Sequence, residues 1–173
     1  MQGSEKVKME DTLKSQDTEE PIDILFYRPL GFRCAVLASK LHITPNMITI
    51  FSIFIGVAAG LLFYPADLKT NVIGMLLLVI ANLMDSTDGQ LARLTDNHTR
   101  LGRILDGLAG DLWFICIYLV CVFRLLNQGF SPWIWLLASA AGVCHIFHAA
   151  MADYYRNIHL FILKSSTGSE QDN

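Results

Sequence analysis

Carboxylates gather in one stretch of this chain, residues 85–111, which reads DSTDGQLARLTDNHTRLGRILDGLAGD. The stretch holds five of the sixteen acidic residues, and apolar segments lie on both sides of it. Carboxylates at the ends of membrane helices are costly to remove from water, so they are usually paired, solvated or bound to a cation. We therefore predict a divalent-metal site at a membrane surface.

The spacing of the first residues in this stretch places them on one helix face. At about 100° per residue, Asp85, Asp88, Gly89, Ala92 and Arg93 all fall on the same side. Two carboxylates three residues apart can hold one hard cation or two neighbouring ones. Gly89 and Ala92 leave a groove in which a planar ligand can approach the backbone, and Arg93 supplies a positive charge for a phosphate. Oxygen ligands without His or Cys favour Mg²⁺ or Mn²⁺ over zinc.

Gly102, Asp106 and Asp111 follow near the start of the next predicted helix. A plainer explanation is that these acids are solvated helix ends paired with the arginines nearby. That explanation suits any single acid. It does not suit the whole set, which shares one face with small residues between its members.

Apolar helices must position these residues. The chain has 173 residues, 53% of them hydrophobic, and the apolar residues are blocked together, which a soluble domain avoids. Thr44 can cap the first helix and Pro45 suits its first position. The predicted fold is an all-α polytopic membrane helix bundle occupying residues 44–163. Its four predicted spans cover about residues 46–64, 71–93, 106–126 and 132–155, lengths that suit a hydrocarbon core of ~30 Å.

Three further segments flank or precede the spans. Residues 22–43 mix apolar and basic side chains, which predicts an amphipathic helix lying in the headgroup layer, with a break at Pro29 or Gly31. Residues 1–21 are polar and predicted to be a disordered cytoplasmic tail. Residues 164–173 form a second polar cytoplasmic segment.

Charge gives the orientation and limits the partners. With the N-terminus inside, most basic residues fall on the inner side, so the acidic stretch is expected on the cytoplasmic face. The net charge is −3, but the two acidic tails account for it, and the segment between them carries +3. The total therefore implies no nucleic-acid partner.

The pattern Asp85-x2-Asp88-Gly89-x2-Ala92-Arg93-x8-Gly102-x3-Asp106 resembles the signature of the CDP-alcohol phosphotransferase family at every fixed position. The Thr44-Pro45-Asn46 start of the first span, with an interfacial helix before it, is also similar to that family. The likeness in organisation extends over about residues 22–155.

The resemblance implies a membrane-embedded transferase of phospholipid biosynthesis. Its members exchange CMP for an alcohol on a CDP-linked substrate, commonly CDP-diacylglycerol. Asp85, Asp88 and Asp106 would then hold two divalent cations. The expected nucleotide-binding residues are Gly89, Ala92, Arg93 and Gly102. The family's usual core has six membrane helices, so a four-span chain is either a fragment or lacks two walls of the site. The acceptor alcohol is not determined by these residues.

One position departs from the family pattern. The family's last Asp, both a metal ligand and the proposed general base, falls at Gly110 here, and Asp111 comes one residue late. In a regular helix Asp111 points about 140° from Asp106 instead of about 40°. We predict a one-residue bulge, helped by Gly107 and Gly110, that returns Asp111 to the metals as ligand and base. Without it, the alternative is a non-catalytic membrane protein or fragment that keeps the fold.

Two weaker patterns complete the prediction. Arg156 and Tyr155, on the face of the fourth span that carries His145 and His148, could bind the acceptor alcohol. Hydrogen bonding between helices would explain that face equally well. Gly56-x3-Gly60 favours close helix packing, either within the bundle or between two copies in a homodimer. A transporter with acids at the membrane midplane is disfavoured, because these carboxylates lie at helix ends on one side.

Overall fold

The computed structural model describes residues 21–97 and 99–164, and this part of the chain is helical and contains no strand. The elements, in chain order, are the π-helical turn η2 (Asp23–Tyr27) and the α-helices α1 (Arg28–Lys40), α2 (Pro45–Leu61), α3 (Leu68–Leu94), α4 (Arg100–Asn127) and α5 (Ile134–Lys164). The predicted all-α bundle is confirmed. The predictions for residues 1–20 and 165–173 lie outside the described residues.

Three helices, α3, α4 and α5, are long and apolar enough to cross a membrane. The first predicted span corresponds to α2, a shorter apolar helix of 17 residues. At 1.5 Å per residue it measures about 25 Å, the short end of what a bilayer core requires. The protein is therefore a polytopic membrane helix bundle with one short member.

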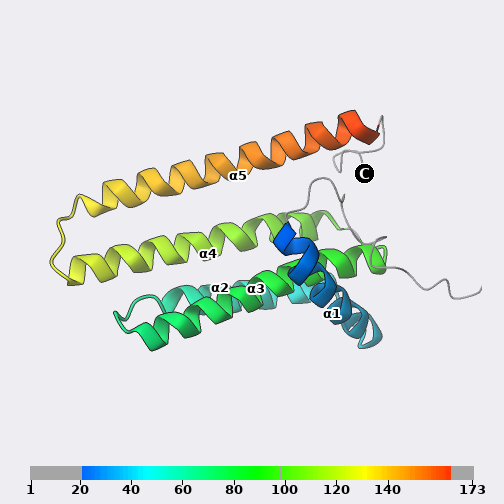
Figure 1. The fold of residues 1–173 in the computed structure, drawn as a ribbon, viewed down its shortest axis with the longest axis horizontal. Helices are drawn as coiled ribbons and strands as arrows, with labels where there is room; N and C mark the ends of the chain where they lie inside the picture. Colours follow the sequence, from blue (N-terminus) through cyan, green and yellow to red (C-terminus); the bar gives the residue numbers. More distant parts are fainter. Residues whose placement is uncertain (1–20, 98, 165–173) are drawn as a thin grey trace, which may run out of the picture.

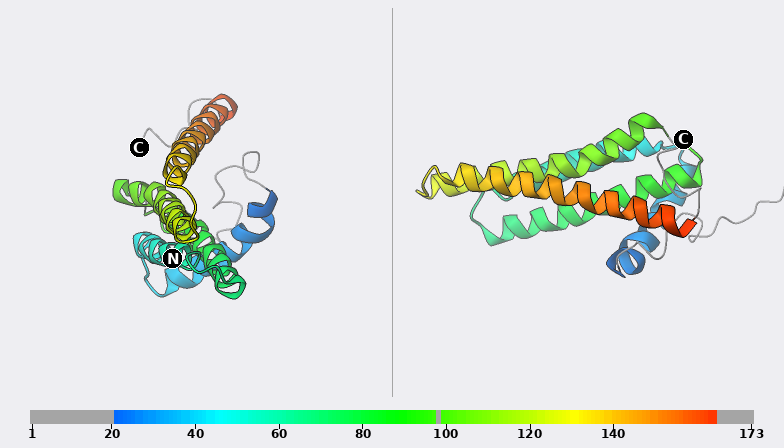
Figure 2. Two further views of the ribbon diagram at one scale, coloured as in Figure 1. Left: turned by 90° about the vertical axis from the view of Figure 1, so that its left-hand side faces the viewer. Right: turned by 90° about the horizontal axis from the view of Figure 1, so that it is seen from above.

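α2 lies at the centre of the packing, because both α3 and α4 pack against it. α5 runs back along α4, and α1 crosses the end of α3 at a steep angle (Figure 1). The left view of Figure 2 shows α5 standing away from α2 and α3. The acidic end of α3, the start of α4 and the end of α5 all lie at one end of the bundle.

Glycines allow α2 to approach its neighbours closely. A Cβ atom on Gly56 would lie 2.3 Å from the indole ring of Trp113 in α4, and one on Gly60 would lie 3.0 Å from Sγ of Cys116. In the same way, a Cβ on Gly74 of α3 would lie 3.0 Å from the Ala59 carbonyl oxygen. The Gly56-x3-Gly60 pattern therefore serves packing within this chain, and a homodimer stays a prediction.

Two helices begin at side-chain caps. The Asp67 carboxylate accepts a hydrogen bond of 3.0 Å from the backbone N–H of Thr70 and so starts α3. Thr99 Oγ1 accepts one of 2.9 Å from the N–H of Gly102 and starts α4 at Arg100. α4 thus begins six residues before Asp106, where the third span is expected to start, because Thr99 caps the helix ahead of it.

The N-terminal helix is irregular before Pro29 and continuous after it. Proline lacks an N–H and crowds the carbonyl four residues earlier, and the π-helical turn η2 falls at that point. The helix does not break at Gly31. Instead, a Cβ there would lie 2.8 Å from Nε2 of Gln90, and this nitrogen donates to the Arg28 carbonyl at 3.2 Å. Gly31 lets α1 lie directly on α3.

Candidate metal and nucleotide site

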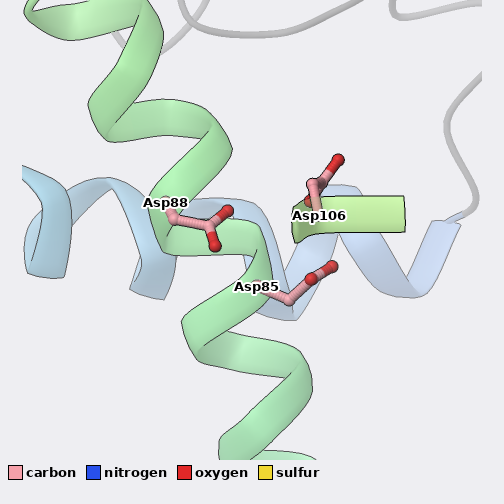
Figure 3. A group of neighbouring side chains, drawn as sticks. All are labelled: Asp85, Asp88 and Asp106. Carbon is pink, nitrogen blue, oxygen red and sulfur yellow. The ribbon is translucent and has the colours of Figure 1, made fainter. Parts of the chain in front are cut away.

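The structure brings three carboxylates together from two helices. Asp85 and Asp88 lie near the end of α3, and Asp106 lies near the start of α4 (Figure 3). One oxygen from each of the three lies within 4.8 Å of the others. Because Thr99 starts α4 at Arg100, Asp106 sits almost two turns into the helix, level with the acidic turn of α3.

The three carboxylates differ in their surroundings. Asp88 is only 3% exposed, and the hydroxyl of Thr49 in α2 donates a hydrogen bond of 2.5 Å to it. Asp85 is half-buried, whereas Asp106 is exposed. Thr49 was missed in the sequence analysis. Its signal is the polar series Asn46, Thr49 and Ser52, spaced by three in an otherwise apolar helix.

The donor set suits a hard divalent cation. All three groups are carboxylates, two carried by α3 and one by α4. Like charges this close repel one another, and a bound cation would offset that repulsion. Oxygen donors without nitrogen or sulfur match Mg²⁺ or Mn²⁺.

A cavity of about 680 Å³ opens beside the carboxylates, and we call it the first cavity. Its wall includes the three aspartates and all of the predicted nucleotide-binding residues, Gly89, Ala92, Arg93 and Gly102. It also includes five arginines, Arg28, Arg93, Arg100, Arg103 and Arg156. The cavity therefore combines metal-type ligands with positive charge suited to phosphates.

Gly89 and Gly102 are glycines for different reasons. A Cβ on Gly102 would lie 2.7 Å from Oδ1 of Asn46 and 2.9 Å from Oγ1 of Thr99, so a side chain there would displace Asn46 and the capping hydroxyl. A Cβ on Gly89 would meet nothing within 4 Å. Packing within the protein does not require glycine at position 89, and the open space beside it faces the first cavity.

Asp111 does not join the carboxylate group. α4 is a regular α-helix from Arg100 to Asn127, so the predicted bulge is absent. Thr99 caps the helix, and the side-chain positions of Gly107 and Gly110 face open space, so nothing in the packing forces an extra residue into the turn. Asp111 is half-buried and is not among the residues of the carboxylate group or of the first cavity wall.

The two residues predicted to bind the acceptor separate. Arg156 lines the first cavity, but Tyr155 is exposed and its ring packs edge-on against Tyr154 at 5.7 Å. His145 packs its ring 4.0 Å from Phe114 of α4, which is a helix-packing role. Asp23 and Tyr27, which the sequence analysis left unassigned, also line the first cavity.

A helical membrane bundle with clustered carboxylates beside an arginine-lined cavity has the side chains to hold a divalent cation and phosphate groups. The sequence matches the family described as CDP-alcohol phosphatidyltransferase over residues 42–163, and the chain belongs to this family. The family uses divalent metal ions, in keeping with the three-aspartate cluster.

Two relatives are similar over part of the chain. One is a ceramide phosphoethanolamine synthase of Drosophila melanogaster, 31% identical over 116 residues, which are 62% of this chain and 28% of that protein. The other is an uncharacterized protein of Aquifex aeolicus (strain VF5), 37% identical over 67 residues, which are 39% of this chain and 33% of that protein. The matches thus span a third or less of the length of these relatives.

Proposed function

We propose that this protein transfers a substituted phosphate group from a CDP-linked donor to an alcohol, with release of CMP, in phospholipid biosynthesis. The observation that carries this proposal is the convergence of Asp85, Asp88 and Asp106 within 4.8 Å, in the wall of an arginine-lined cavity. The family match over residues 42–163 supports it.

The carboxylates, the glycines and one arginine of the first cavity each have a part in this proposal. Asp85, Asp88 and Asp106 would hold divalent ions, Mg²⁺ or Mn²⁺ and two in number, which when bound neutralise charge on phosphoryl oxygens. Arg93 would bind the phosphate of CMP, while Gly89 and Ala92 leave room for the nucleotide. Gly102 contributes through the packing of Asn46, which keeps the start of α4 against α2.

The reaction is a direct displacement at phosphorus. The acceptor oxygen forms a new P–O bond, the P–O bond to CMP breaks, and CMP leaves with the bonding electron pair. The hydroxyl proton passes to a base. Asp111 can be that base only if α4 gains one residue in the turn after Asp106 when substrates bind.

The lipid can belong to either substrate. The family resemblance favours a lipid donor, CDP-diacylglycerol, and a small alcohol whose polar groups contact Arg156. The name of the Drosophila relative describes ceramide carrying phosphoethanolamine. Carried over to this chain, that name favours a lipid as the acceptor.

A second candidate function is a membrane protein that binds the metal and nucleotide without transferring the phosphate group. The position of Asp111 outside the carboxylate group favours it. This candidate predicts cation binding together with no release of CMP. The first candidate predicts both.

The deciding experiment is a CMP-release assay on the purified protein in lipid nanodiscs. The protein is supplied with Mg²⁺, CDP-linked donors and a panel of alcohols. We expect release that depends on both metal and alcohol, and a loss of at least ~100-fold in Asp88→Asn, which removes a charged metal ligand. Absence of release with every pair of substrates, or equal release from Asp88→Asn, would overturn the proposal.

A further inference from the structure

A second, smaller cavity of about 220 Å³ lies between α3 and α4. Its wall consists of Leu78, Asn82, Asp85, Asp106, Gly110, Trp113, Phe114 and Ile117. Asn82, Asp85 and Asp106 are shared with the first cavity. The second cavity therefore begins at the candidate reaction centre and continues among apolar side chains.

The two cavities lie on opposite sides of the Asp85–Asp106 pair. Along α3, Leu78 lines only the second cavity and precedes Asp85, whereas Gly89 and Arg93 line only the first cavity and follow it. Along α4, which runs antiparallel to α3 (Figure 1), the second-cavity residues follow Asp106. The first cavity thus faces the loop end of the bundle, and the second extends toward the middle of the spanning helices.

Gly110 keeps the second cavity open next to the carboxylates. It lies one turn after Asp106 on the same face of α4, and a Cβ there would meet nothing within 4 Å. The next residues along this face are Phe114, which is 41% exposed, and Ile117. Beside the carboxylates the wall therefore consists of the Gly110 backbone and the Asn82 side chain, and beyond them it is hydrocarbon and aromatic.

We propose that the second cavity holds the hydrocarbon chain of a lipid alcohol, so that the acceptor of the reaction is a lipid. This inference rests on the proposed function. In phosphoryl transfer the attacking and leaving oxygens lie roughly in line with the phosphorus. With CMP leaving into the first cavity, the attacking hydroxyl comes from the opposite side, where the second cavity ends at Asp85 and Asp106.

The chemistry of the wall selects the kind of alcohol. A small water-soluble alcohol such as a polyol would lose its hydrogen bonds to water among Leu78, Phe114 and Ile117 without replacing them. A lipid alcohol places apolar chain there and presents only its hydroxyl to the carboxylate end. The arginines of the first cavity, including Arg156, are then left for the phosphates of the donor.

Two leucine substitutions on the same helix test the inference. Gly110→Leu fills the second cavity beside the carboxylates. Gly107→Leu is the control, because it adds the same side chain three residues away. A Cβ on Gly107 also meets nothing within 4 Å, and Gly107 lines neither cavity. We expect Gly110→Leu to lower kcat/KM for a lipid alcohol by about 10- to 100-fold. The affinity for a CDP-linked donor should not change, and Gly107→Leu should behave as the wild type.

A readout that does not depend on turnover is photo-cross-linking. A long-chain alcohol with a photoactivatable group in its chain is incubated with the protein in nanodiscs, and the labelled peptide is identified by mass spectrometry. We expect label on the α4 segment containing Phe114 and Ile117, and its loss in Gly110→Leu. If Gly110→Leu does not fold, Phe114→Ala replaces it as the test variant. Phe114→Ala enlarges the second cavity, so we expect it to shift acceptor preference toward bulkier chains.

The outcomes separate this inference from the proposed function. CMP release with water-soluble alcohols only, equal effects of the two leucine variants, or label outside this segment would overturn the lipid acceptor and leave the transferase standing. Absence of CMP release with every alcohol would overturn the transferase itself. Release with lipid alcohols, sensitive to Gly110→Leu alone, supports both.

Discussion

At the scale of single residues, the site combines groups that a motif can reveal with groups that it cannot. Asp85, Asp88 and Asp106 stand out as charges beside apolar helices. Thr49 does not, yet it donates the hydrogen bond that Asp88 accepts in its buried position. A buried carboxylate needs such a partner because desolvation without one is costly. We therefore expect Thr49 to influence metal binding indirectly, by stabilising the Asp88 carboxylate.

The role of Thr49 predicts a selective effect on metal binding. Thr49→Val removes the hydroxyl with little change of shape and leaves Asp88 without this donor. Partners that orient metal ligands typically contribute 10- to 100-fold in affinity, so we expect Mn²⁺ binding to weaken by about 10-fold. Titration of the protein in nanodiscs, followed by electron paramagnetic resonance, measures it.

Ser52→Ala is the control for this variant. Ser52 is also a buried hydroxyl of α2, but it donates to the backbone carbonyl of Thr49 at 2.8 Å and not to a carboxylate. Its Mn²⁺ affinity should equal that of the wild type. Equal losses in both variants would mean that α2 packing, and not the hydrogen bond to Asp88, controls the site.

Substitution of Gly89 is expected to weaken ligand binding without destabilising the protein. A Cβ at this position meets nothing in the protein and alanine favours the helix, so Gly89→Ala should not lower the unfolding temperature. It should nevertheless weaken binding of CMP with Mg²⁺ by about 10-fold, because the methyl group occupies space that the ligand uses. Isothermal titration beside a thermal-unfolding assay gives both quantities. A lower unfolding temperature with normal CMP affinity would assign Gly89 to packing.

At the scale of elements, α2 is the helix that sets the site geometry although it carries none of the acids. Both α3 and α4 pack on it, and Asn46 at its start contacts the position of Gly102. Small residues make this possible, because Gly56 accepts the indole ring of Trp113 and Gly74 accepts the Ala59 carbonyl. The three aspartates meet because two helices share this third one as support.

Gly56→Ala tests the packing of α2 against α4. The added methyl group would lie 2.3 Å from the ring of Trp113, which is only 4% exposed and cannot move without repacking the core. Overpacking of this kind typically costs about 1–3 kcal/mol. Unfolding in mixed micelles of increasing denaturing detergent measures the loss, and Gly107→Ala, at an open position, should show none. A Gly56→Ala protein as stable as the wild type would show that α2 and α4 can separate enough to accept the methyl group at little cost.

At the scale of the whole molecule, basic residues are concentrated at one end of the bundle. The first cavity with its five arginines lies at the end that holds the start of α4 and the end of α5. The opposite end holds Arg124, which donates to the Phe63 carbonyl at 3.0 Å. Since basic residues are enriched on the cytoplasmic side of membrane proteins, we propose that the site faces the cytoplasm.

Cysteine labelling tests this orientation. Cys34 in α1 is exposed at the site end, and Ser131 lies in the exposed turn between α4 and α5 at the other end. With Cys116, Cys121 and Cys144 replaced by alanine, a membrane-impermeant maleimide on intact cells should label Ser131→Cys and not Cys34. Labelling of Cys34 before permeabilisation would place the site on the outer face.

Most of the helices and the candidate metal ligands could be predicted from the order of the residues alone. Apolar runs and turn residues locate helices because hydrogen bonding within a helix is local, and the spacing of Asp85, Asp88 and Arg93 implies a shared face for the same reason. The family resemblance followed from that spacing and is confirmed by the match over residues 42–163. Helix starts were less well predicted, since a cap such as Thr99 is one polar residue in a polar loop.

Which residues meet across helices could not be predicted in this way and follows from the packing of the bundle. It placed Thr49 against Asp88, laid α1 on α3 through Gly31, and opened a second cavity at Gly110. It also kept α4 regular, so that Asp111 stays outside the carboxylate group. These outcomes depend on how closely helices approach and in which rotation. Packing of small side chains between helices sets that approach, and no periodicity within one helix encodes it.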